Sequence, residues 1–217
     1  MNIELSAEEA RVIGCLIEKQ ITTPDQYPLS LNALTNACNQ KTNRDPLMAL
    51  DEPSVQHTLD ALARRHFVME KSGFGSRVPK FHQRFCNSEY GTLKFSAQEL
   101  AIVCELLLRG AQSAGELRTR ASRMAAFADA AEVESVLTGL MQRTDGPFVA
   151  RLPRESGQRD VRFAQLFKKE PARAAAAGPA APVETTAAPQ SARLERLEAE
   201  VRSLRAELDA LKSQLGS

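Results

Sequence analysis

The chain has 217 residues, of which 43% are hydrophobic and 25% charged, and its formal net charge is +1. This length allows one large domain or two small ones, and the composition is sufficient to bury a core, so a wholly disordered chain is excluded. No window approaches the roughly 18 consecutive apolar residues of a membrane span. The first nine residues are acidic where a signal peptide is basic, so we expect a cytoplasmic protein with no membrane partner.

Four cysteines are present, Cys15, Cys38, Cys86 and Cys104, with no CxxC pair and no histidine at ligand spacing. A structural zinc site is therefore not expected, and no cofactor is predicted. Cys15 and Cys104 lie in apolar helical runs, which favours small buried hydrophobes over redox-active thiols.

The first predicted helix recurs later in the chain. Residues 5–9 (LSAEE) match residues 95–99 (FSAQE) at an offset of 90. In each copy a serine can cap a helix while the glutamate three positions later reaches back to it, and apolar residues follow at i, i+3 and i+4. The sequence therefore predicts a repeat between residues 5–85 and 95–167.

The later elements of the two copies follow the same order. Ser30 and Ser113 can each cap a second helix, and Asp51 and Asp129 can each cap a third. Two short β-branched or aromatic runs around a glycine turn then predict a hairpin. The hairpin segments are 67–71 with 77–85 in the first copy and 148–152 with 160–167 in the second.

Three helices followed by a hairpin is the order of a winged helix-turn-helix. We expect an α+β, mainly helical fold: two tandem winged helix-turn-helix domains (1–90 and 91–170), a flexible linker (171–192) and a C-terminal coiled-coil helix (193–217). Any other small α+β unit duplicated once is the alternative, while the hairpins argue against an all-helical bundle.

The run IEKQITTPDQYPLSLNAL at 17–34, continued by ACNQKTNRDP at 37–46, resembles the bacterial YceH family over roughly residues 3–168. The resemblance implies a cytoplasmic protein of two winged-helix domains and leaves the function open. The ending differs in length from the shorter one expected for this family, so its interpretation rests on this sequence alone.

The segment 171–192 contains ten Ala and four Pro in 22 positions, a composition that predicts a tether. Beyond it, apolar residues spaced 3 and 4 apart form a heptad pattern, with complementary charges at the flanking positions. A parallel homodimer is expected. A lone helix folded back on its own domain and a trimer are the alternatives. The predicted dimerisation residues are Leu194, Leu197, Val201, Leu204, Leu208, Leu211 and Leu215.

A helix-turn-helix reads the major groove with its second motif helix, here the third helix of each copy, while the wing meets phosphate. In the first copy, residues 64–84 hold six Lys/Arg against one Glu. The polar run 40–46 could also reach phosphate, or it could equally be a capped turn with no ligand. The predicted DNA-binding residues are Lys41, Asn43, Arg44, Ser54, Gln56, His57, Arg64, Arg65, Lys71, Arg77, Lys80 and Arg84.

The second copy differs, because Glu132 and Glu134 would repel phosphate from its third helix, although its hairpin is basic. This copy could hold the DNA backbone or dock a protein partner, and both hairpins could simply be solvated faces.

Among functions, the charges favour a DNA-binding protein and transcriptional regulator whose first copy reads double-stranded DNA. A non-enzymatic protein-interaction module is the alternative. An enzyme is not expected, since the three histidines His57, His66 and His82 join no nucleophile set and neither a P-loop nor HExxH occurs. A small-molecule effector also stays open.

Overall fold

A computed structural model describes residues 3–71, 78–89, 91–154 and 160–167. The described residues form six α-helices and two small three-stranded sheets, so the fold is mixed and mainly helical. The described ranges all fall in one compact unit, Met1–Ala172, and a second unit spans Arg173–Ser217. The predicted linker, coiled coil and dimerisation residues lie outside the described residues.

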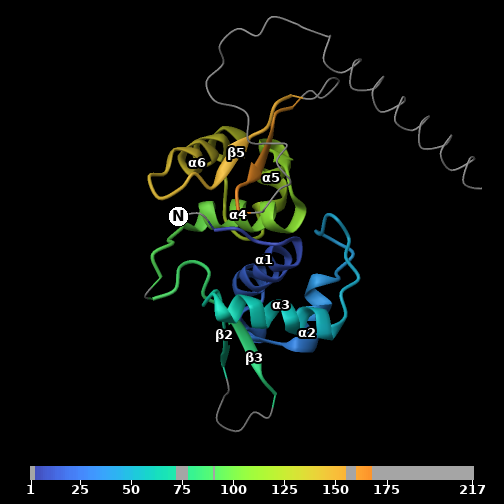
Figure 1. Ribbon diagram of the computed structural model, residues 1–217. Helices are drawn as coiled ribbons and strands as arrows, with labels where there is room; N and C mark the ends of the chain where they lie inside the picture. The colour runs from blue at the N-terminus through green and yellow to red at the C-terminus, as the bar shows by residue number, and fades with distance from the viewer. Residues whose placement is uncertain (1–2, 72–77, 90, 155–159, 168–217) are drawn as a thin grey trace, which may run out of the picture. The chain divides into compact units, whose positions relative to one another are not determined.

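The first half of the compact unit contains three α-helices, a 3-10 turn and a small antiparallel sheet of order β1-β3-β2 (Figure 1). Its elements are α1 (Ala7–Thr22), the 3-10 helix η1 (Pro24–Gln26), β1 (Leu29–Ser30), α2 (Leu31–Cys38), α3 (Glu52–Arg64), β2 (Val68–Lys71) and β3 (Lys80–Gln83).

The second half repeats this order, with an antiparallel sheet of order β4-β6-β5. Its elements are α4 (Ala97–Arg109), β4 (Gln112–Ser113), α5 (Ala114–Ala121), α6 (Ala130–Gln142), β5 (Val149–Arg151) and β6 (Arg162–Gln165). The sequence did not predict β1 and β4, because a two-residue strand is too short to show an alternating pattern.

The predicted helix starts are confirmed at all six helices. Each capping side chain accepts a hydrogen bond from the backbone N–H three residues later, and α1, α4 and α5 also form the reciprocal capping box. The capping residues are Ser6, Ser30, Asp51, Ser96, Ser113 and Asp129.

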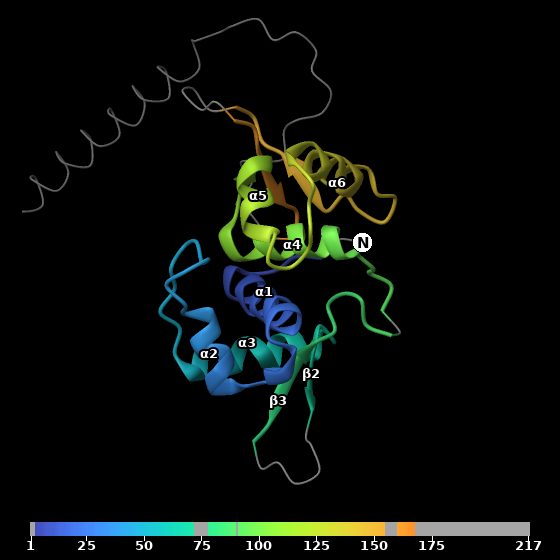
Figure 2. The same cartoon turned by 180° about the vertical axis from the view of Figure 1, so that it is seen from behind.

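The two halves pack through their first helices, α1 and α4, which lie against each other at the centre of the unit (Figures 1 and 2). Gly14 allows the close approach, since a Cβ built there would lie 2.8 Å from Leu108 Cδ2. Beside it, the Cys104 thiol donates to the Gly14 carbonyl at 3.3 Å. All four cysteines are free and buried, as the sequence predicted for Cys15 and Cys104.

A chain of aromatic contacts also joins the halves. Phe85 of the first half contacts Phe167, which stacks on Phe148 of the second half, and Phe148 contacts Phe95 edge to face. The Leu5 N–H donates to the Phe167 carbonyl at 2.5 Å, so the end of the second half is tied to the start of the first. The buried residues of both halves therefore form one continuous core.

The hairpins β2–β3 and β5–β6 lie at opposite ends of this unit in both views (Figures 1 and 2). Because the seam between α1 and α4 fixes the halves, the two hairpins face different regions of solvent. A ligand held at one hairpin therefore does not reach the other by local contact.

Candidate nucleic-acid interface

The hairpin β2–β3 presents a basic outer face. Strand alternation turns Phe81 and Gln83 toward the core and leaves Lys80 exposed on the other side. Lys71 is the register partner of Lys80, and both lysines are exposed. Like charges directly opposite each other destabilise an antiparallel pair. Within the described ranges neither lysine forms an ion pair, so both charges are open to an anion from solution.

The same face continues toward the body of the first half. Met69 lies opposite His82, and Arg84 donates a long hydrogen bond to the Met69 sulfur at 3.6 Å. Burial lowers the pKa of His82, and the charges of Lys71 and Arg84 lower it further, so the imidazole is neutral at pH 7. The cationic character of this face thus comes from its lysines and arginine. Arg77, predicted on the same hairpin, lies outside the described residues.

The exposed face of α3 carries mixed charge. His57 and Arg64 are exposed, and Ser54 and Gln56 are half-buried. The Gln56 amide donates to the Asp60 carboxylate at 2.8 Å, so an acidic group lies among the predicted reading residues. Because residues four apart lie on the same face of a helix, the sequence also places Asp60 beside Gln56. The helix can offer hydrogen bonds, but the Asp60 carboxylate offsets the charge of Arg64 on this helix.

Arg65 has a structural role in addition to its exposed position. Its guanidinium donates to both Glu9 carboxylate oxygens at 3.0 Å and to the Glu4 carbonyl at 2.6 Å, and it lies 4.7 Å from the centre of the Phe67 ring. These contacts tie the end of α3 to the start of α1. Arg65 is nonetheless exposed, and its contact with DNA stays a prediction. Thr58 of α3 is buried, and its hydroxyl donates to the Ser54 carbonyl at 2.9 Å.

The turn 40–46 directs two of its polar side chains into the protein. Arg44 is only 4% exposed, and its two terminal nitrogens donate to the Glu18 carboxylate at 3.1 and 2.6 Å. The Asn43 amide donates to Glu105 at 3.1 Å. Of the two interpretations that the sequence left open, these contacts leave Arg44 and Asn43 bonded within the protein and not facing phosphate, which corrects their place among the DNA-binding residues. Lys41 is exposed, and its contact with DNA stays a prediction.

Four charged side chains meet at the seam between the halves. Glu18 of α1 and Glu105 of α4 are fully buried, and Arg123 donates to Glu18 at 2.5 Å and to Glu105 at 2.9 Å. Burial alone would raise the pKa of Glu18, but hydrogen bonds and charge from Arg44 and Arg123 bring it below its usual value. The cluster therefore holds the α2–α3 connection, through Arg44, and the α5–α6 connection, through Arg123, against α1 and α4. A lone glutamate inside each apolar helical run was the sequence signal for it.

The second half presents a different surface. Glu134 and Thr138 are exposed on α6, and Arg151 and Arg154 are exposed on or beside β5. Among the described residues no group of three or more His, Cys, Asp or Glu could hold a metal ion. None of the helices in the described part of the chain combines the length and the apolar character needed to cross a membrane.

This architecture is a duplicated helical unit with a basic hairpin at one end, and comparison with known proteins places it in a family. A family model described as "Protein of unknown function, DUF480" matches residues 5–158. A UPF0502 protein of Klebsiella pneumoniae is 58% identical over 217 residues, and one of Cronobacter sakazakii is 57% identical over 218 residues. The UPF0502 protein YceH of Salmonella paratyphi B is 56% identical over 222 residues.

Each of these alignments covers 100% of this chain and 100% of the relative. The chain therefore belongs to the UPF0502 (YceH) family, which confirms the resemblance seen in the sequence. The alignments include the segment after residue 170, so the expectation that this ending departs in length from the family is wrong.

Proposed function

We propose that the chain is a non-enzymatic, cytoplasmic DNA-binding protein that holds double-stranded DNA with the β2–β3 hairpin and the adjoining end of α3. In this interpretation each half is a winged helix-turn-helix, α3 takes the position of the reading helix, and the hairpin is the wing. The observation that carries the proposal is that Lys71 and Lys80 lie directly opposite each other on an exposed face and form no ion pair among the described residues.

A DNA duplex supplies anions that can pair with these lysines. Phosphates follow one another along each strand, so a narrow hairpin with lysines on both strands can contact neighbouring phosphates at once. Arg84 extends the basic face, and Arg64 provides a further exposed cation at the end of α3. His57 and Gln56 are the side chains best placed to hydrogen-bond base edges.

The magnitude of the salt effect follows from these cations. If Lys71, Lys80, Arg84 and Arg64 each neutralise one phosphate, the logarithm of the affinity falls with a slope of about −3.6 against the logarithm of salt concentration. Between about 50 and 200 mM salt the affinity then falls about 100-fold for one protomer. Sequence selectivity from α3 would make the protein a transcriptional regulator.

We further propose that the heptads at 193–217 pair two chains in parallel, which would present two hairpins to a symmetric site. The spacing of Leu194, Val201, Leu208 and Leu215 supports this pairing. Sedimentation of the full chain beside a chain ending at Glu170 tests it. A larger mass for the full chain alone is expected, and equal masses would remove the coiled coil from the proposal.

The test of DNA binding is fluorescence anisotropy with labelled genomic fragments at about 50 and 200 mM salt, combined with selection of bound sequences. Enrichment of an inverted repeat is expected, and because a dimer engages two hairpins, its binding should weaken roughly 10⁴-fold between these salt concentrations. Absence of binding at the lower salt concentration would overturn the proposal. The alternative, a protein-docking module built on the same fold, would then take its place.

A further inference from the structure

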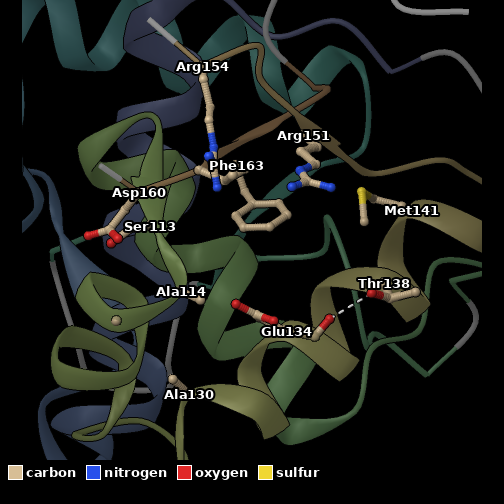
Figure 3. A pocket seen from close by; sticks show the side chains of 12 residues that line it. Ser113, Ala114, Ala130, Glu134, Thr138, Met141, Arg151, Arg154, Asp160 and Phe163 are labelled. Atoms are coloured by element: carbon tan, nitrogen blue, oxygen red, sulfur yellow. Dashed lines mark hydrogen bonds between the residues drawn. The ribbon is translucent and has the colours of Figure 1, made fainter. Parts of the chain in front are cut away.

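The second half contains a groove of about 500 Å³ between α6 and the β5–β6 hairpin (Figure 3). Its volume lies within the range of small-molecule sites in proteins. No feature of the proposed DNA contact uses this groove, because the β2–β3 hairpin lies at the other end of the unit.

The groove has four chemically different parts. Arg151 and Arg154 extend into it from the hairpin, the Phe163 ring lies between them and α6, α6 contributes Glu134 and Thr138, and a second carboxylate, Asp160, lies beside Ser113 at the start of α5 (Figure 3). In the part of the chain that the structure describes, neither guanidinium forms an ion pair or a side-chain hydrogen bond, and neither does the Glu134 carboxylate. The Thr138 hydroxyl donates to the Glu134 backbone carbonyl at 2.8 Å and retains its lone pairs.

These parts fit one ligand chemistry. Two neighbouring guanidinium groups recognise a phosphate through paired charge-assisted hydrogen bonds. The apolar floor of the groove, formed by Met141 and the small accessible part of Phe163, which is 7% exposed, suits a planar base. A carboxylate accepts hydrogen bonds from hydroxyl or amino groups, as acidic residues do for ribose in dinucleotide sites.

We propose that this groove binds a nucleoside phosphate, with the phosphate at Arg151 and Arg154, the base against Phe163, and sugar or amino donors at Glu134. Inorganic phosphate alone satisfies only the arginines. A continuous DNA backbone would bring further phosphates toward the Glu134 side of the groove, where they are repelled. The carboxylate therefore favours a ligand that is anionic at one end and rich in donors at the other.

The test is isothermal titration of the full chain with the four nucleoside 5′-monophosphates, with inorganic phosphate and with a short DNA duplex. At least one nucleotide is expected to bind with a dissociation constant on the order of 10–100 µM. The double variant Arg151→Ala/Arg154→Ala should weaken that binding about 10- to 100-fold, because it removes the charged donors. Glu134→Gln should weaken it by about 3- to 10-fold while leaving the affinity for inorganic phosphate unchanged or higher.

The matched control is Lys71→Ala/Lys80→Ala, which removes two charges from the other hairpin and should leave nucleotide binding unchanged. No nucleotide binding at about 5 mM would overturn the proposal. Phosphate binding as tightly as the nucleotides would also overturn it. So would loss of duplex binding in the arginine variant without any nucleotide binding, since the arginines would then serve the DNA backbone. The unfolding transition of each variant, compared with wild type, separates loss of the site from loss of the fold.

Discussion

Removal of the Glu18 charge should destabilise the protein by about 3 kcal/mol, because it leaves Arg44 buried without its counter-ion. The side chains of Glu18 and Arg44 are both 0% exposed, and two hydrogen bonds join them. Loss of one partner from a buried pair costs about 3–5 kcal/mol. The lower end applies because Arg44 keeps hydrogen bonds to the Ala37 carbonyl and the Gln40 side chain, at 3.0 and 2.9 Å.

Urea unfolding of Glu18→Ala, Arg44→Ala and the double variant measures this effect. The double variant should be less destabilised than the sum of the single variants by about 2 kcal/mol, since neither charge is then left alone. Glu134→Gln, which changes an exposed helical glutamate, is the control and should stay within about 0.5 kcal/mol of wild type. A cost below about 1 kcal/mol for Glu18→Ala, or strictly additive effects, would refute the reasoning.

Three further predictions concern the same unit. Gly14→Ala should destabilise it by about 1–3 kcal/mol, because the new Cβ meets the buried Leu108. Gly139→Ala has no atom within 4 Å of its added Cβ and should stabilise the unit by up to about 1 kcal/mol. Thermal unfolding measures both variants, and stability changes of the same sign would contradict this prediction. The pKa of Glu18 is lowered by folding, so its contribution to stability is fully present above the unfolded value of about 4.3 and is lost as pH falls through the folded value. Urea titrations at about pH 7 and pH 3.5 should therefore show the gap between wild type and Glu18→Gln narrowing in acid, and a constant gap would contradict the assignment. The four thiols are buried, and burial raises the pKa of Cys86 to about 12. A thiol reagent should therefore label the native chain slowly and should label all four cysteines in urea. Rapid labelling of the native chain would contradict this prediction.

The repeated elements could be predicted from the sequence because their signals are local. A capping serine or aspartate, a glutamate three residues on and an apolar stripe specify where a helix begins, and all six starts are found in the structure. The hairpin strands were found with ends displaced by up to three residues, since the ends of strands depend on pairing that a single run does not show.

The roles of individual charged residues were harder to predict. Arg44 and Asn43 lie in a polar turn whose sequence fits a phosphate-binding loop equally well. Only the packing of α1 against α4 shows that Arg44 donates to Glu18 and Asn43 donates to Glu105. Arg65 has the same explanation, because its partner Glu9 is 56 residues away in the chain. Long-range pairing of this kind leaves no spacing pattern in the sequence.

The most direct test of the central claim, that DNA is held by the first hairpin, is the salt dependence of duplex binding in two double variants measured side by side. Lys71→Ala/Lys80→Ala should weaken binding and make the slope shallower by about 1.8 for each protomer bound, because each hairpin loses two phosphate contacts. Arg151→Ala/Arg154→Ala removes the same charge at the opposite hairpin and should leave the slope unchanged. An unchanged slope in the lysine variant, or an equal change in both variants, would contradict the claim.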